Sequence, residues 1–187
     1  MKEKTHLGNR LLSVLLTFLM LLSLLPSAAL AADTQQIALM AVTQDGFLIK
    51  PEYVTYHSGD TVKDVLKKSG HTFSGIDNGY ITAVDGTTDN FSIHYDEDGY
   101  KLDQSADGLT AIWFTTNSDQ SHGANLQKLA ANMAVYNTAT NGLKDYKAAQ
   151  EAYDAAVKGF YAATDTKAKT LNDALFSAID KHAKFLE

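Results

Sequence analysis

The chain has 187 residues, with 16 basic and 22 acidic side chains and a net charge of −6. It contains no cysteine, which excludes disulfides, thiolate metal sites, cysteine nucleophiles and a lipid-bearing cysteine. Arg10 is its only arginine, and arginine is the side chain best suited to binding phosphate. Nucleic acids and anionic membranes are therefore not expected as partners.

The amino terminus has the pattern of a secretory signal peptide. Its basic residues are Lys2, Lys4 and Arg10. Residues 11–25 are apolar except for three hydroxyl side chains, and Pro26 then breaks any helix. This apolar run is shorter than the roughly 20 residues that a membrane-spanning helix needs. We expect cleavage between Ala31 and Ala32, and a mature protein that is secreted or at the cell surface without stable membrane insertion.

After the signal peptide, residues 1–31, the composition changes once along the chain. Residues 32–117 are rich in glycine, threonine, tyrosine and aspartate, with short apolar runs separated by Asp-Gly and Asn-Gly pairs. This pattern indicates strands joined by turns. In residues 118–187 glycine becomes rarer and apolar residues recur at helical spacing among alanines and lysines. The sequence therefore predicts two modules, the first built on strands and the second on helices.

Strands are expected in the first module at residues 37–42, 47–56, 80–84, 91–95, 100–102 and 109–115. The pair Asp45-Gly46 predicts a hairpin between the first two strands. Pro51 lies inside the second strand, where it predicts a bulge or a sheet edge, because proline cannot donate a backbone hydrogen bond.

A short helix is expected at residues 61–68, between the first hairpin and the later strands. Asp60 is the predicted cap and Gly70 the predicted end. Two strands, a helix and further strands is the order of a β-grasp domain. The predicted fold class is α+β, with a small β-grasp-like domain, β-β-α-β-β, followed by an antiparallel three-helix bundle.

Two motifs in this module resemble a known family. They are Asp60-Thr61-Val62, which begins the predicted helix, and Gly79-Tyr80-Ile81, which leads to a glycine turn. They are similar to a β-grasp family of unknown function that is related to the carboxy-terminal domain of transcobalamin and intrinsic factor. Its members occur in secreted and surface proteins of Gram-positive bacteria, so the resemblance implies a Gram-positive source. In the vitamin carriers a large helical barrel supplies much of the corrinoid site, and this chain has no room for one.

The second module is alanine-rich and contains three predicted helices. Their apolar faces fall within residues 126–136, 146–160 and 171–186. Asn141-Gly142 is expected to end the first helix, and either Thr164 or Asp165 to cap the third. Short connections favour antiparallel neighbours, hence the three-helix bundle. Helical modules of this kind follow β-grasp domains in bacterial surface proteins, where they resemble spacers.

The sequence offers few residues for metal binding or catalysis. Seven acidic side chains lie between Asp85 and Asp107, and Asp96 and Asp98 are the weak calcium candidates among them. Turn formation is the leading interpretation, because the closing glutamate of a calcium loop is missing. No histidine pair has zinc-site spacing, and no serine lies in a nucleophile elbow. We therefore expect no cofactor and no enzymatic activity.

Aromatic residues of the first module are the candidates for ligand binding. Most are expected to be buried, with Phe91 and Tyr95 on one face of their strand. Trp113 and Phe114 must point to opposite faces, so one of them is expected to be exposed or covered by the helices. The ligand-binding candidates are Tyr80, Tyr95, Tyr100 and Trp113.

A secreted or cell-surface binding or adhesion module, without catalytic activity, is the leading functional hypothesis. Its partner would be an extracellular protein, a glycan or an envelope polymer bound by the β-grasp domain, with the helices as a spacer. Two alternatives remain open. One is a carrier of a corrinoid-like small molecule, which predicts a concave apolar site. The other is a structural segment of a larger cell-envelope protein, which predicts no pocket.

Overall fold

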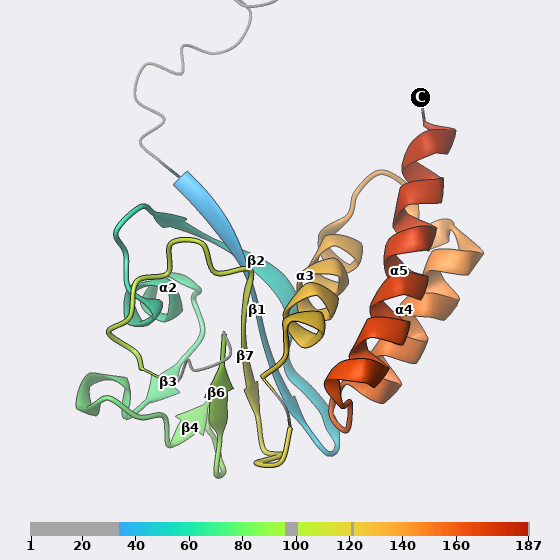
Figure 1. Cartoon of the computed structure of the whole chain (residues 1–187). Coiled ribbons are helices and arrows are strands. Elements are labelled where there is room, and N and C mark those ends of the chain that lie inside the picture. The colour runs from blue at the N-terminus through green and yellow to red at the C-terminus, as the bar shows by residue number, and fades with distance from the viewer. Residues whose placement is uncertain (1–33, 96–100, 121, 187) are drawn as a thin grey trace, which may run out of the picture. The chain divides into compact units, whose positions relative to one another are not determined.

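The computed structural model describes residues 34–95, 101–120 and 122–186. Thr34–Glu187 form one compact unit. Its described residues form a mixed α and β fold with four α-helices and two sheets. Figure 1 shows how these elements are arranged. The mixed class agrees with the sequence prediction.

The larger sheet has the strand order β2-β1-β7-β6. Its strands are β1 (Thr34–Thr43), β2 (Gly46–His57), β6 (Ser92–His94) and β7 (Ala111–Thr115). β1 and β2 form the predicted antiparallel hairpin. β1 is parallel to β7, and β6 is antiparallel to β7. The first and last strands of the sheet are thus its two central neighbours.

Pro51 lies both on a sheet edge and at a bulge, the two positions that its sequence context predicted. β2 is an edge strand, and the register between β1 and β2 shifts at this proline. Leu39 pairs with Glu52, whereas Ala41 pairs with Ile49. Two residues of β2, Lys50 and Pro51, therefore face one residue of β1. The bulge leaves proline where no ladder hydrogen bond is needed.

The predicted short helix is α2 (Val62–Lys68), but its cap differs from the prediction. The Thr61 hydroxyl accepts a hydrogen bond from the Asp64 backbone N–H at 3.2 Å, and the Asp64 carboxylate accepts one from the Thr61 N–H at 2.9 Å. This reciprocal pair is a capping box. Asp60 instead accepts a hydrogen bond from the backbone N–H of His57 and pairs with Lys68. Thr61 is the capping residue, in place of Asp60, because the helix begins one residue later than expected.

A second, smaller sheet was not predicted. It contains β3 (Phe73–Ser74), β4 (Ala83–Val84) and β5 (Thr87–Thr88), in that order, with the 3-10 turn η1 (Ile76–Asn78) between β3 and β4. The strand expected at residues 80–84 is reduced to β4. In the strand expected at 100–102, residue 100 lies outside the described part of the chain, and residues 101 and 102 are not in a strand.

The carboxy-terminal segment contains the three predicted helices. They are α3 (Ala124–Thr138), α4 (Lys147–Phe160) and α5 (Asp165–Phe185), with a 3-10 turn, η2 (Leu143–Asp145), between α3 and α4. Thr164 is the cap of α5, and its hydroxyl accepts a hydrogen bond from the Lys167 N–H at 3.3 Å. Thr164 rather than Asp165 is therefore the capping residue. Gly142 directly precedes η2 and lies four residues beyond the end of α3, so the prediction that Asn141-Gly142 ends this helix is wrong.

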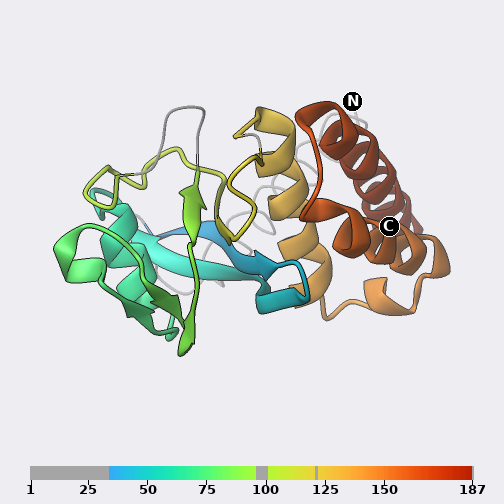
Figure 2. The ribbon, with the colours of Figure 1, turned by 90° about the horizontal axis from the view of Figure 1, so that it is seen from below.

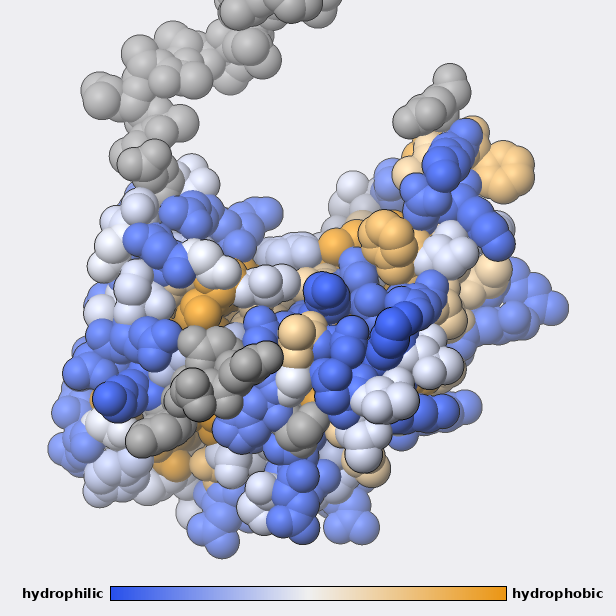
Figure 3. Space-filling view, viewed as in Figure 1, coloured by the Kyte–Doolittle hydropathy of each residue, from blue (hydrophilic) through white to orange (hydrophobic). Residues whose placement is uncertain are grey.

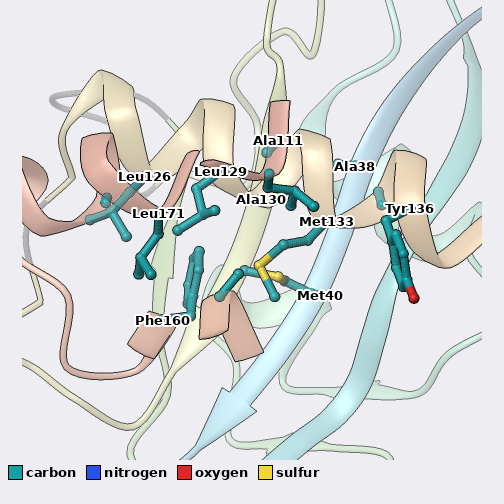
Figure 4. Close-up of a cluster of buried hydrophobic side chains, with 14 of the residues drawn as sticks. Ala38, Met40, Ala111, Leu126, Leu129, Ala130, Met133, Tyr136, Phe160 and Leu171 are labelled. Carbon is teal, nitrogen blue, oxygen red and sulfur yellow. The ribbon is translucent and has the colours of Figure 1, made fainter. Parts of the chain in front are cut away.

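The larger sheet separates two hydrophobic cores. One face packs against α2 and includes Ile112 and Phe114. The other face packs against the helices and includes Met40 and Trp113. Figure 4 shows side chains of α3 meeting those of β1 in this second core, with Phe160 of α4 among them. Trp113 and Phe114 thus point to opposite faces as predicted, and the helices cover Trp113.

Side chains of the segment between β7 and α3 join the sheet to the helices. The Trp113 indole N–H donates to Gln120 Oε1 at 3.1 Å, and Gln120 Nε2 donates to the backbone oxygen of Phe160 at 2.6 Å. Asn117 Nδ2 donates to the backbone oxygen of Tyr161 at 2.8 Å. In Figures 1 and 2, α3 lies between the sheet on one side and α4 and α5 on the other. The sheet and the helices therefore pack around a shared core and are not two modules joined by a flexible linker.

Candidate functional site

A two-part hollow lies on the α2 side of the larger sheet. Its larger part, about 430 Å³, is lined by Lys63 and by residues 76–79 and 101–103. Its smaller part, about 190 Å³, is lined by residues 79–81, Phe91, Ile93 and Leu102. Gly79 and Leu102 line both parts. We treat these two neighbouring hollows, defined by their lining residues, together and call them the groove.

The larger part of the groove is charged. Asp77 Oδ1 lies 2.9 Å from the Lys63 ammonium and 2.8 Å from the Lys67 ammonium. Hydrogen bonds from Lys67 and then Lys63 lower the pKa of Asp77 to about 2, so this carboxylate stays ionised at neutral pH. Lys101 and Asp103 also line this part, and neither forms an ion pair with any other described residue.

The smaller part of the groove is apolar. Ile81, Phe91 and Ile93 are partly buried against the core on the α2 side. Tyr80 stands beside them with 57% of its surface exposed, one of the few large hydrophobic residues that the described part of the chain leaves open to solvent. An open ring next to an apolar wall and a charged wall can bind a ligand that is itself partly apolar and partly polar.

Two glycines set the turn that carries Asp77 and Tyr80. Gly75 and Gly79 flank η1, each with a φ of 84°, a left-handed conformation that side chains disfavour. A Cβ atom on Gly75 would lie only 2.6 Å from the backbone oxygen of Tyr80. Gly75 therefore permits the close approach that places Tyr80 at the groove.

Replacing Gly75 by alanine should both destabilise the protein and disturb the groove. The left-handed φ costs an alanine about 1–2 kcal/mol, and the clash with the Tyr80 backbone adds to this. We expect the free energy of unfolding in urea to fall by roughly 2 kcal/mol. Gly108→Ala is the matched control, because Gly108 also has a φ of 80° but a Cβ atom there would have no other atom within 4 Å. Equal losses in both variants would contradict a special role for the Gly75 contact.

The predicted site residues fall in different places. Tyr80 lines the groove. Tyr95 is fully buried, and its hydroxyl donates to the Lys101 backbone oxygen at 2.7 Å and accepts from the Lys101 N–H at 2.6 Å. Tyr95 thus fixes the backbone of Lys101, which lines the groove, but does not line the groove itself. Trp113 is fully buried on the helix side of the sheet. Tyr100 and the calcium candidates Asp96 and Asp98 lie outside the described residues.

Two histidine clusters lie away from the groove. His71 bridges two carboxylates, with Nδ1 2.7 Å from Asp85 and Nε2 3.1 Å from Glu52. His94 is 1% exposed and stacks on Trp113, its cross-strand partner, at a centroid distance of 5.3 Å. The His122 ring meets His94 edge-on at 4.2 Å. In the described ranges no group of three or more histidine, aspartate or glutamate residues is arranged to hold a metal ion.

Sequence reasoning did not single out most of the groove. Lys63, Asp77 and Lys101 come from α2, η1 and a loop, and no local pattern links them. Tyr80 is the one groove residue among the ligand-binding candidates that the structure describes. The paired glycines at positions 75 and 79, which bracket a short polar segment, are the only sequence signal of a tight turn at this place.

Comparisons with known protein families, with curated proteins and with solved structures give no match for this chain. Among the helices of the described residues, none combines the length and the apolar character needed to cross a membrane.

Proposed function

We propose that the protein is a secreted or cell-surface binding module without catalytic activity, and that its ligand occupies the groove. The observation that carries this proposal is the exposed ring of Tyr80 in the apolar part of the groove, next to a part lined by Lys101 and Asp103, which form no ion pair with any other described residue. Such a surface offers stacking, burial and hydrogen bonding together. An extracellular protein, a glycan or an envelope polymer could supply all three.

The charges of the groove favour binding over catalysis. General acid–base catalysis at neutral pH is most efficient with a group whose pKa lies near 7. The pKa of Asp77 is held at about 2 by Lys67 and Lys63, so this carboxylate is a fixed charge rather than an acid or a base. It serves in this proposal to hold η1 against α2, and so to keep Tyr80 in place.

We also propose that the architecture is of the β-grasp type followed by a three-helix bundle. The parallel pairing of β1 with β7 at the centre of the sheet, with α2 following the first hairpin, supports the β-grasp assignment. The packing of α3, α4 and α5 in one core supports the bundle. In this arrangement the helices cover one face of the sheet and leave the groove on the other side free to bind.

Export from the cytoplasm is part of the same proposal. The compact unit begins at Thr34, just after the expected cleavage between Ala31 and Ala32, so removal of the signal peptide would leave the folded unit whole. Amino-terminal sequencing of the protein recovered from the culture medium or the cell surface tests this. A mature chain that starts at Ala32 supports export, and an uncleaved Met1 in the cytoplasm contradicts it.

Tyr80→Ala tests the groove as the binding site. We expect this change to weaken binding of the ligand roughly tenfold, because an aromatic contact of about 1.5 kcal/mol is removed. Binding is measured by calorimetric titration with peptides, oligosaccharides and envelope polymers. The control is Phe176→Ala, since Phe176 is 56% exposed but lies on α5. Binding that is lost in the control and retained in Tyr80→Ala would place the site elsewhere.

A small-molecule carrier is the second candidate. The volume of the larger part of the groove, about 430 Å³, falls within the range of small-ligand sites. Equilibrium dialysis with cobalamin tests the corrinoid version of this idea directly. Saturable binding that Tyr80→Ala abolishes would favour the carrier. If no ligand of either class binds, the role as a structural segment of a larger envelope protein becomes the best account.

A further inference from the structure

His71 connects the two sheets through its side chain. Its Nδ1 atom lies 2.7 Å from Asp85 Oδ2, and its Nε2 atom lies 3.1 Å from Glu52 Oε1. Asp85 belongs to the turn between β4 and β5 of the smaller sheet, whereas Glu52 belongs to β2, an edge strand of the larger sheet. We call these three residues the His71 bridge. It joins two sheets that have no backbone ladder in common among the described residues.

The two contacts of the ring together require a protonated imidazole. A neutral imidazole has one N–H donor, and its other nitrogen carries a lone pair. An ionised carboxylate can only accept, so a neutral ring bonds one of the two carboxylates and turns its lone pair toward the other. The imidazolium has an N–H on each nitrogen and bonds both. The bridge with both carboxylates ionised therefore fits the charged state of His71.

The charges around the ring leave His71 as the cation of this cluster. The charged side chains that contact it are Glu52 from β2 and Asp85 from the β4–β5 turn. Lys67 and Lys68, in the last turn of α2 just before His71, pair with carboxylates outside the bridge. β3, the strand that follows, carries no charged side chain. No described lysine forms an ion pair with either carboxylate of the bridge.

Loss of the proton should break the bond to Glu52 and keep the bond to Asp85. Asp85 is fixed next to the ring, because its Oδ1 accepts from the Thr72 N–H at 2.8 Å and its own N–H donates to the Thr72 backbone oxygen at 2.9 Å. The contact with Glu52 is the longer of the two. The neutral ring should therefore keep its proton on Nδ1 and turn a bare Nε2 toward Glu52, which is a repulsive contact.

We propose that the His71 bridge is a pH-sensitive link, which holds the smaller sheet to β2 when His71 is protonated and releases Glu52 when the ring is neutral. Histidine side chains change their charge between about pH 5 and 8, so the link loosens as the pH rises through this range. Phe73 and Val84 of the smaller sheet stay buried in the core on the α2 side, and the loosening is therefore local.

The link acts on the part of the chain that carries the groove. η1, with Asp77, lies between β3 and β4 of the smaller sheet. The link works without a ligand in the groove, and so does not depend on the proposed function. The three side chains of the bridge are 25–35% exposed, which limits the contribution of the bond to that of a solvent-screened ion pair.

The test is hydrogen exchange of the purified protein, followed by NMR from about pH 5.5 to 8 and corrected for the intrinsic exchange rate at each pH. The reporters are the backbone amides of Thr72, Thr82 and Asp85, which donate hydrogen bonds within and beside the smaller sheet. Their protection should fall about fivefold as the pH rises, the effect of losing one partly exposed ion pair. The ring nitrogen signals of His71 should titrate with the same midpoint, and the neutral ring should carry its proton on Nδ1.

Glu52→Gln distinguishes a pH-sensitive link from a purely structural contact. The glutamine side chain can accept a hydrogen bond from the protonated ring and donate one to the bare Nε2 of the neutral ring. Protection should therefore stay nearly constant over the same pH range. The control is His57→Gln, which alters an exposed histidine at the end of β2 and should keep the fivefold fall.

Three results would overturn the proposal. One is protection that does not change while His71 titrates, and another is a fall in Glu52→Gln as large as in the unaltered protein. The third is a neutral ring that carries its proton on Nε2, because Glu52 would then stay bonded. His94 does not interfere, since burial lowers its pKa to about 4, below the range of the experiment.

Discussion

Phe160→Ala should destabilise the whole protein by about 3–5 kcal/mol, the usual cost of truncating a buried phenylalanine. Phe160 is fully buried, and its ring meets Trp113 edge-on at a centroid distance of 6.1 Å. Because this contact joins α4 to the sheet, the loss should appear in both parts. Urea unfolding followed by circular dichroism for the helices and by Trp113 fluorescence for the sheet measures it, and the two transitions should coincide.

Phe176→Ala is the control for this experiment. Phe176 lies on α5 with 56% of its surface exposed, so its removal should change stability by no more than about 0.5 kcal/mol. Figure 3 shows that the visible face around the helices is largely hydrophilic, with apolar surface near the end of α5. Separate transitions for helices and sheet, or a loss below about 1 kcal/mol in Phe160→Ala, would contradict the shared core.

Stability should fall as the pH is lowered through the range where His94 titrates. Burial, and then the charge of His122, lower the pKa of His94 from 6.5 to about 4. The folded state therefore favours the neutral ring more than the unfolded state does. The contribution of neutral His94 to the free energy of unfolding is complete above about pH 6.5 and is lost as the pH falls toward 4. Its full size is roughly 3 kcal/mol.

The structural cause of this expected pH dependence is the lack of partners for His94. Neither of its ring nitrogens has a hydrogen-bond partner among the described residues, and the same holds for Nδ1 of His122. Trp113, stacked on His94, and Phe160, at the edge of Trp113, carry no charge. His122 is the titratable group in contact with the ring. A proton on His94 would thus be a buried charge with no compensating anion among the residues that the structure describes.

Urea unfolding at a series of pH values compares the protein with His94→Leu and with the control His57→Gln, which alters an exposed histidine. His94→Leu should lose the decline between pH 6.5 and 4, whatever its absolute stability, and His57→Gln should keep it. The lowered pKa of Asp77, about 2, makes its own contribution fall only below about pH 4. An unchanged slope in His94→Leu would refute the assignment.

The fold was predictable where the apolar pattern was long or the turn residues were distinctive. The hairpin of β1 and β2, the bulge at Pro51, the helix α2 and the three later helices all follow from local patterns. The two-residue strands β3, β4 and β5 did not, because such short pairs are set by tertiary packing rather than by residue periodicity. The cap of α2 was misplaced by one residue, from Thr61 to Asp60.

The groove was predictable only in part for a different reason. Tyr80 could be singled out as an aromatic residue near turn glycines, but nothing in the sequence indicates that Lys101 and Asp77 line the same pocket. That arrangement depends on the hydrogen bonds that tie the loop before β7 to α2 and to Tyr95. Trp113 illustrates the converse: its burial depends on the position of the helices, which local patterns do not give.

The parallel pairing of β1 with β7 has a consequence for the order in which the chain can fold. During synthesis β1 is made early. Its parallel neighbour β7, however, is complete only when residue 115 has been added. Until then β1 can pair with β2 alone, which leaves one edge of β1 open, and the face that later packs against α3 stays uncovered. The nascent protein should therefore remain unfolded until most of it has been made. The pairing of β1 with β7 joins segments far apart in the sequence, and such contacts form slowly. A chain that folds late stays unfolded long enough to be translocated through a narrow channel.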